Sequence, residues 1–309
     1  GEMGLLGIGV PEEYGGSGGD LMNWVVAGEE IAACSSAVSL SMGAHGNLCV
    51  WNLYNNGTEA QRQRWLPDLC SGRKVGSLCI TEPDTGSDAV GMQTRAVADG
   101  EDHLLTGTKT WITNAPVADL FIVYAKTNPD AGARGITAFV LERGMEGLSF
   151  SKPFDKMGCR GSPTGQVYME GVRVGPENIL GGLNRGVNVL MSGLDVERAI
   201  FASLPVGQAR RCLELAIQYA QERKQFGRPI AQFQLVQAKI ADMYTNLEAS
   251  RLMVWKACHA LTKMERGGKG TPTHKLAAAA LLFSAEAAEK IAYDAVQIHG
   301  GNGFSKEFE

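Results

Sequence analysis

Two short segments in the first half of the chain carry side chains suited to a flat or anionic ligand. Residues 81–88 read Thr-Glu-Pro-Asp-Thr-Gly-Ser-Asp and directly follow an apolar run. A loop of this composition can turn backbone N–H groups and short hydroxyls toward carbonyl oxygens or an anion. From this segment alone, an ordinary turn without a ligand is the simpler interpretation.

Trp111, Ile112 and Thr113 end the next apolar run. An indole can stack on a flat ring, and a threonine hydroxyl can donate to a ring nitrogen. Taken alone, the triad is better explained by packing in a core.

Two further positions carry charge on predicted helices. Arg223 stands near the end of a long helical pattern, just before Gly227. Its guanidinium could pair two oxygens of a pyrophosphate at once, although a solvated arginine at a helix C-terminus is the alternative. Glu197 and Arg198 close the motif Leu-Asp-Val-Glu-Arg, and without further context they read as a solvated helix pair.

The composition excludes several classes of protein. With 309 residues, 44% hydrophobic and 20% charged, the chain is long enough for two or three cores, and its net charge of −4 gives no reason to expect nucleic acid. No run of about 20 apolar residues predicts a membrane span. Seven scattered cysteines without a CxxC pair, and five histidines without ligand spacing, predict free thiols in a reducing compartment and no metal site.

The apolar pattern divides the chain into three regions. Residues 20–71 have a helical period, with a capping box at Thr58 and a helix stop at Gly72. The next region has short apolar runs between turn residues, which predict an antiparallel sheet that closes on itself. These runs are residues 75–81, 104–113, 120–125, 136–141 and 166–174.

The helical period returns from residue 184 to residue 300, with three apolar stripes that predict a helical bundle. Pro205 is expected to kink or end a helix, and residues 267–270 are the clearest break between helices. The sequence therefore predicts an α+β multidomain fold: an N-terminal helical domain over residues 1–72, an antiparallel β-barrel over residues 73–183, and a C-terminal helical bundle over residues 184–309.

Five motifs in this order resemble the acyl-CoA dehydrogenase family, and most closely its isovaleryl-CoA branch. They are residues 78–88, 111–114, 194–198, 223–227 and 297–303. The resemblance covers nearly the whole chain. It implies the same three-region architecture, with FAD held between barrel and bundle, and α,β-dehydrogenation of an acyl-CoA thioester.

The resemblance assigns a role to individual residues. Cofactor-binding positions are Leu78, Cys79, Ile80, Thr81, Ser87, Trp111, Ile112 and Thr113, and, for the FAD of a neighbouring subunit, Arg223, Gln225, Phe226, Gln234, Gln297, Gly300 and Gly301. Substrate-binding positions are Ser87, Asn188, Asp195 and Arg198. Because two subunits share the cofactor in the family, the resemblance implies a homo-oligomer, a tetramer.

Glu197 matches the catalytic base of the isovaleryl-type branch. Most relatives carry this glutamate near the C-terminus instead, on a segment beyond Glu309. A carboxylate suits the removal of an α-proton if its surroundings raise its pKa above about 4.3. Meanwhile the β-hydrogen leaves as hydride for N5 of the flavin.

Two departures from the family pattern bear on the reaction. Asn188 stands where isovaleryl enzymes tend to have tyrosine, so the acyl group is expected to differ. The family also has further helices before residue 1 and another helix after residue 309, and we expect the natural protein to be longer at both ends. That last segment normally donates a backbone N–H to the thioester carbonyl.

Several alternatives stay open from the sequence. An acyl-CoA oxidase or a flavin monooxygenase has the same fold, and a non-catalytic acyl-CoA-binding module would need no flavin chemistry. The expected electron acceptor is an electron-transfer flavoprotein. Free thiols and the absence of a signal peptide fit a bacterial cytoplasm, or alternatively a mitochondrial matrix.

Overall fold

The computed structural model describes residues 1–262 and 271–308, which form two compact units. The sheet unit comprises Gly1–Asp20 and Leu40–Glu197, and the helical unit comprises Leu21–Ser39 and Arg198–Glu309. The expected break at residues 267–270 lies outside the described residues. Because the units group Leu21–Ser39 with the C-terminal helices, the division into three domains at 72 and 183 stays a prediction.

The sheet unit is built on an eight-stranded sheet in the order β6-β7-β3-β2-β4-β5-β8, with β1 paired to β4. The five predicted strands are confirmed, and three shorter ones, β2, β6 and β8, escaped the sequence analysis. The strands are β1 (Gly76–Cys79), β2 (Arg95–Asp99), β3 (Asp102–Thr113), β4 (Leu120–Lys126), β5 (Ile136–Glu142), β6 (Leu148–Phe150), β7 (Thr164–Val174) and β8 (Ile179–Leu180).

The expected closed antiparallel barrel is not confirmed among the described residues. Strands β6 and β8 are the ends of the pairing order, and no pairing joins them. Strand β2 reaches β4 through a single residue pair, Arg95 with Lys126. In addition, β1 and β4 run parallel, so the sheet is mixed. These two edge strands are only three and two residues long.

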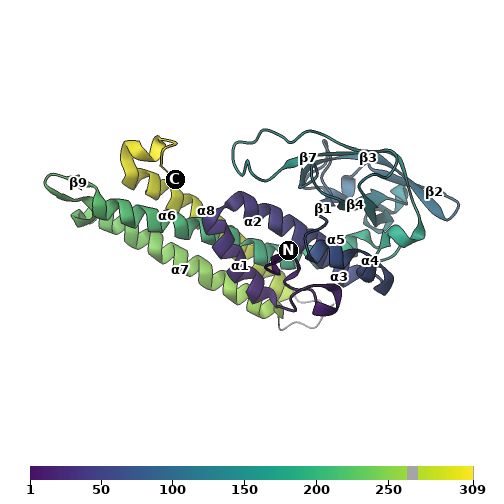
Figure 1. Ribbon diagram of the computed structural model, residues 1–309, viewed down its shortest axis with the longest axis horizontal. Coiled ribbons are helices and arrows are strands. Elements are labelled where there is room, and N and C mark those ends of the chain that lie inside the picture. The colour runs from purple at the N-terminus through teal and green to yellow at the C-terminus, as the bar shows by residue number, and fades with distance from the viewer. Residues whose placement is uncertain (263–270, 309) are drawn as a thin grey trace. The chain divides into compact units, whose positions relative to one another are not determined.

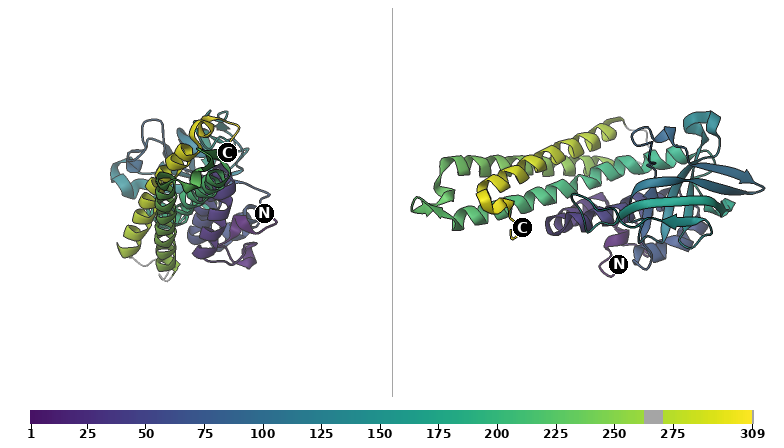
Figure 2. Two further views of the ribbon diagram at one scale, coloured as in Figure 1. Left: turned by 90° about the vertical axis from the view of Figure 1, so that its left-hand side faces the viewer. Right: turned by 90° about the horizontal axis from the view of Figure 1, so that it is seen from above.

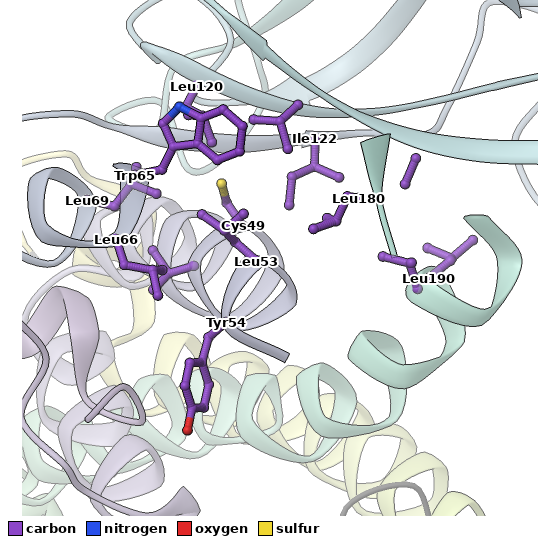
Figure 3. Close-up of a cluster of buried hydrophobic side chains, with 14 of the residues drawn as sticks. Cys49, Leu53, Tyr54, Trp65, Leu66, Leu69, Leu120, Ile122, Leu180 and Leu190 are labelled. Atoms are coloured by element: carbon purple, nitrogen blue, oxygen red, sulfur yellow. The ribbon is translucent and has the colours of Figure 1, made fainter. Parts of the chain in front are cut away.

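Short helices pack against one face of this sheet. Their core joins Leu53 and Trp65 to Leu120, Ile122 and Leu180 of the sheet, all 0–1% exposed (Figure 3). These helices are the π-helix η3 (Ala44–Val50), α3 (Trp51–Asn56), α4 (Glu59–Cys70) and the first part of α5 (Gly186–Phe201). Helix α2 (Ser36–Gly43) directly precedes η3 in the chain. A second core, which contains Phe121 and Phe139, fills the other side of the sheet.

The predicted helix signals around α4 are confirmed. The Thr58 hydroxyl accepts from the Gln61 N–H, and the Gln61 side chain accepts from the Thr58 N–H, which completes a capping box. Gly72 follows the C-cap with a φ of 76°, a conformation that favours glycine. The helix therefore has fixed ends, and its last turn leads directly into β1.

Four long helices make up most of the helical unit. They are α1 (Leu21–Cys34), α6 (Ser203–Glu222), α7 (Gln234–Thr262) and α8 (Thr271–His299), and the last three run alongside one another (Figures 1 and 2). Pro205 lies in the first turn of α6, where its missing N–H costs nothing, and α5 ends just before at Phe201. The predicted interruption at Pro205 is thus confirmed.

An ion-pair network ties α1 to this bundle. Arg251 of α7 donates to Glu29 at 2.7 Å, and Arg210 of α6 donates to Glu30 at 2.6 and 2.8 Å. Gly207 allows close contact, because a Cβ there would lie 2.3 Å from the Glu29 carbonyl oxygen. These contacts explain why Leu21–Ser39 groups with the C-terminal helices.

Candidate functional site

The structure brings two of the sequence-predicted segments together in the sheet unit. The Ser77 hydroxyl of β1 donates to the Thr113 carbonyl at 2.6 Å, and the Thr110 N–H of β3 donates to the Thr81 carbonyl at 2.8 Å. Residues 78–81 and residues 111–113, the paired segments from here on, therefore lie side by side. The family resemblance placed both at the cofactor, and the fold makes them neighbours.

A buried histidine anchors the start of β1. The His45 ring on the π-helix accepts from the Gly76 N–H through Nδ1 at 2.8 Å, so Nε2 carries the proton toward the Leu69 carbonyl at 3.1 Å. Burial lowers the pKa of His45 to about 4, which keeps the ring neutral at physiological pH. One uncharged side chain thus links the π-helix, α4 and β1.

Side chains alternate along β1 and its continuation. Leu78 and Ile80 face the helices and are partly buried against their core. Cys79 faces the other core, is fully buried, and has a thiol pKa raised to about 12 by burial. The Cys79 thiol is therefore not available to a ligand.

Trp111 is turned outward by an irregularity in β3. The register against β7 shifts between Lys109 and Ile112, and Trp111 has a φ of 58°. Such a left-handed backbone costs a tryptophan roughly 1–2 kcal/mol, so surrounding contacts must hold it. As a result the Trp111 side chain is 62% exposed, whereas Ile112 beside it is buried.

Asn114 holds the end of the irregular stretch. Its φ is 69°, and its side-chain amide donates to the Ser41 carbonyl at 2.9 Å and to the Gly76 carbonyl at 3.4 Å. Thr113, one residue earlier, stays partly exposed at the end of the strand. The paired segments thus end in an exposed indole and a partly exposed threonine.

A buried ion pair joins the loop after β1 to strand β3. Lys109 Nζ donates to a Glu82 carboxylate oxygen at 2.9 Å and to the Ile80 carbonyl at 3.0 Å, and the lysine side chain is 0% exposed. Glu82 also accepts from the Gln93 N–H at 2.5 Å and from the Thr94 N–H and hydroxyl at 3.0 and 2.5 Å. The pair therefore fixes both ends of residues 82–94.

Several groups set the pKa of the Glu82 carboxyl. Burial raises it, but the Lys109 ammonium and the donors from Gln93 and Thr94 outweigh burial and hold the pKa below its ordinary value. Burial lowers the pKa of Lys109, and Glu82 opposes that shift. The pair is therefore charged at neutral pH, in a setting where one member without the other is costly.

Ser87 sits in the exposed part of the loop that this pair anchors. Reciprocal backbone hydrogen bonds of 2.9 and 3.2 Å join Glu82 and Thr85, and the Asp88 carboxylate accepts from the Gly91 N–H at 3.1 Å. Between those two braces Ser87 is exposed. It is therefore available to a ligand.

Helix α5 carries the predicted base. Glu197 is partly exposed and lies one turn after Gly193, so both share a face of the helix. A Cβ at Gly193 would lie 2.5–2.9 Å from the side-chain amide of Asn52, which is 1% exposed. Asn52 thus packs on the helix face from which Glu197 projects.

The other positions predicted on α5 are not all brought to that face. Asn188 precedes Glu197 by nine residues, which is half a turn out of phase, so the two side chains leave the helix on opposite sides. Arg198 is partly exposed, and the side chain of Asp195 lies outside the described part of the structure. The site on α5 is therefore centred on Glu197 rather than on Asn188.

In the helical unit, the predicted cofactor residues gather at the end of α6. Arg223 is the C-cap of α6 and precedes a hairpin of β9 (Lys224–Gln225) and β10 (Arg228–Pro229) (Figure 1). Phe226 and Gly227 turn the hairpin with φ of 51° and 78°. Arg223, Gln225, Phe226 and Gln234 are all exposed.

An aromatic cluster joins this region to the end of α8. The Tyr219 ring stacks on His299 with centroids 4.4 Å apart, and its hydroxyl accepts from the Asn302 amide at 2.9 Å. Tyr219 lies one turn before Arg223, and His299 precedes Gly300. The structure thus brings exposed Gln297, Gly300 and Gly301 near the predicted phosphate-binding end.

Sequence reasoning missed four residues that organise these sites. Lys109 was read as part of an apolar strand, although a lysine inside such a run, following a glutamate in the preceding loop, signals a buried pair. Tyr219 belongs to an apolar stripe of the helical region 184–300, which by itself predicts only packing. His45 and Asn52 gave no signal, because their partners Gly76 and Gly193 are distant in sequence.

The comparisons with known proteins agree along the whole chain. Family models match it throughout: the acyl-CoA dehydrogenase N-terminal domain over residues 1–73, the middle domain over 77–172 and the C-terminal domain over 184–309. Mitochondrial isovaleryl-CoA dehydrogenase of Solanum tuberosum is 46% identical, over 100% of this chain and 73% of its own length.

A bacterial relative and a solved structure are also similar to this chain over nearly its whole length. The probable acyl-CoA dehydrogenase YngJ of Bacillus subtilis (strain 168) is 43% identical, over 100% of this chain and 80% of its own. Butyryl-CoA dehydrogenase from Megasphaera elsdenii superposes with a TM-score of 0.94 at 37% identity, over 99% of this chain and 80% of that one.

Replacing Lys109 by Met is predicted to lower the free energy of unfolding by about 3–5 kcal/mol, because Glu82 is left charged and buried. The measurement is guanidinium unfolding at neutral pH, with Lys152→Met, in an exposed loop, as the control that changes it by less than about 0.5 kcal/mol. A Lys109→Met variant as stable as its control would contradict the buried pair.

The same variant has a pH signature. Because the folded-state pKa of Glu82 is depressed, its contribution is present above the ordinary value of 4.5 and is lost as pH falls through the folded value. The difference in the free energy of unfolding between the parent and Lys109→Met should therefore shrink as the pH falls below 4.5. A constant difference would show that Glu82 is not the group concerned.

Replacing Gly193 by Ala is predicted to cost about 1–3 kcal/mol, because the new methyl group overlaps the Asn52 amide. Asn52→Ala removes the atoms that the new methyl group overlaps. Asn52→Ala should therefore lower the free energy of unfolding by less in the Gly193→Ala background than in the parent. Unfolding of the four proteins gives this coupling. Strict additivity would contradict the close packing of α3 on α5.

Proposed function

The chain belongs to the acyl-CoA dehydrogenase family and is an oxidoreductase acting on CH–CH groups; from this premise we propose that it is an FAD-dependent dehydrogenase of a short, branched acyl-CoA thioester. The observation that carries the proposal is the side-by-side placement of the paired segments, with Trp111 turned outward at their end.

The chemistry of these residues fits FAD. An isoalloxazine is flat, with an apolar edge and a polar edge, and the site offers an exposed indole at Trp111 beside the hydroxyls of Thr81 and Thr113. The side chains of Cys79 and Ile112 are buried and would not contact the flavin. The residues that would hold the flavin are Leu78, Cys79, Ile80, Thr81, Ser87, Trp111, Ile112 and Thr113.

Bound FAD supplies, at its N5, the acceptor for the hydride that leaves the β-carbon of the thioester. Glu197 takes up the α-proton on a carboxylate oxygen, and α5 fixes where that carboxylate projects. The tight packing of Gly193 on Asn52 limits sideways movement of this helix. Ser87, Asp195 and Arg198 would bind the acyl-CoA.

The substrate class rests on the relatives and on the position of the base. A relative 46% identical to this chain is named an isovaleryl-CoA dehydrogenase, and Glu197 matches the base of that branch. We therefore place the reaction in branched-chain amino acid catabolism. Asn188 leaves α5 on the opposite side from Glu197, so this geometry gives no support to a substrate contact at Asn188.

A second subunit would complete the cofactor site. Arg223, Gln225, Phe226 and Gln234 are exposed at one end of the helical unit, as a contribution to a neighbour's FAD requires. Large apolar side chains are also exposed along α7 and α8, which favours burial against another copy. We propose a homotetramer, the assembly typical of the family, in which Gln297, Gly300 and Gly301 meet the adenine end.

We further propose an electron-transfer flavoprotein as the electron acceptor and a bacterial cytoplasm as the location, with the mitochondrial matrix as the alternative. Relatives include a bacterial protein and mitochondrial enzymes. None of the described helices is both long and apolar enough to cross a bilayer.

Replacing Glu197 by Gln is predicted to leave the flavin bound but to slow its bleaching by isovaleryl-CoA about 10²–10⁴-fold, since the general base is lost. Anaerobic stopped-flow absorbance measures this step. The control is Glu101→Gln, at an exposed turn between β2 and β3. Flavin reduction at the parent rate in Glu197→Gln would rule out this base.

Replacing Arg223 by Ala is predicted to weaken FAD binding by about 1.5–3 kcal/mol, because a charge-assisted pair to phosphate is lost. The variant should purify with less flavin and, at low concentration, with a smaller mass by light scattering. Arg134→Ala, at an exposed arginine of the sheet unit, is the control. Full flavin occupancy and an unchanged oligomer would sink the assignment.

A further inference from the structure

Trp111 presents most of its side chain to solvent, but one aromatic side chain lies against its ring. Its ring meets Phe154 edge to face, with centroids 4.9 Å apart and planes at 64°. This is a favourable geometry for an aromatic pair. Phe154 is itself only partly exposed, and it lies in the connection between β6 and β7.

The backbone around Phe154 is tied to the strand that borders Trp111. The Phe154 N–H donates to the Thr164 carbonyl at 2.8 Å, and Thr164 pairs with Thr113 in the register of β3 and β7. Further along the same connection, Lys156 Nζ donates to the Ser162 carbonyl at 2.6 Å. The backbone that carries Phe154 is thus held in place relative to the irregular end of β3.

We propose that Phe154 is a positioning residue, which fixes the orientation of the Trp111 indole so that it can pack against the flavin. This inference rests on the proposed function and adds to it a residue that need not touch the cofactor. A tryptophan on an exposed irregular strand has two free torsion angles. Phe154 restricts both before the ligand arrives.

The expected size of the effect follows from the cost of immobilising one side chain on binding. That cost is about 0.5–1.5 kcal/mol, which corresponds to about 2- to 12-fold in Kd. Phe154→Leu keeps an apolar side chain but removes the ring, so it should weaken FAD binding by this factor. Phe154→Tyr keeps the ring, so its affinity for FAD should equal that of the parent.

The experiment measures two quantities on the full chain. FAD affinity is obtained by titrating apoprotein, and the state of Trp111 is followed by fluorine NMR of protein labelled with 5-fluorotryptophan. Five resonances are expected for the five tryptophans, and the one lost in Trp111→Phe belongs to Trp111. The matched control is Phe150→Leu, since Phe150 lies in the same segment but stacks on Phe121, with centroids 4.8 Å apart, rather than on Trp111.

We expect Phe154→Leu, but not Phe150→Leu, to shift the Trp111 resonance in apoprotein and to raise the Kd for FAD. In a Trp111→Leu background, Phe154→Leu should have no further effect on affinity, because Phe154 acts through the indole. An unchanged Kd in Phe154→Leu, or an equal loss in both backgrounds, overturns the inference.

The outcome also separates this inference from the proposed function. If the parent protein takes up no FAD, the proposed function fails and the inference falls with it. If the parent binds FAD and Phe154→Leu binds it equally well, only the positioning role is overturned.

Discussion

The buried pair of Glu82 and Lys109 is the contact on which the arrangement of the paired segments depends. Lys109 precedes the irregular stretch of β3, and Glu82 begins the loop that carries Ser87. Because neither charge can reach water, each requires the other, and the backbone on both sides is held at hydrogen-bond distance. Such a pair adds little net stability, but it strongly disfavours any arrangement that separates the two segments.

Close to this ion pair, the proposed site contains a strained backbone and an exposed ring. Trp111 has a left-handed backbone and an exposed ring, while the residues before and after it are buried. Strain of this kind persists only where neighbouring contacts determine the backbone, and here Asn114 and the strand register supply them. A neighbouring contact also fixes helix α5, because the buried amide of Asn52 packs on the helix face that presents Glu197.

The sequence predicts most of the fold, because its long elements have clear periods. The capping box at Thr58 and the five apolar runs are found as expected. Strands β2, β6 and β8 were missed because they are short or mostly exposed, and sheet closure cannot be read from periodicity. Site residues could be matched through local motifs, but His45 and Asn52 act through partners far along the chain, and no local pattern encodes those contacts.

We propose that the paired segments form a flavin site served by Glu197. Titration of the purified protein with FAD, followed by anaerobic addition of isovaleryl-CoA, tests this claim most directly. We expect one FAD per chain and loss of the visible absorbance of oxidised flavin when the thioester is added. A protein that binds no FAD, or whose flavin stays oxidised with every short acyl-CoA, would contradict the account.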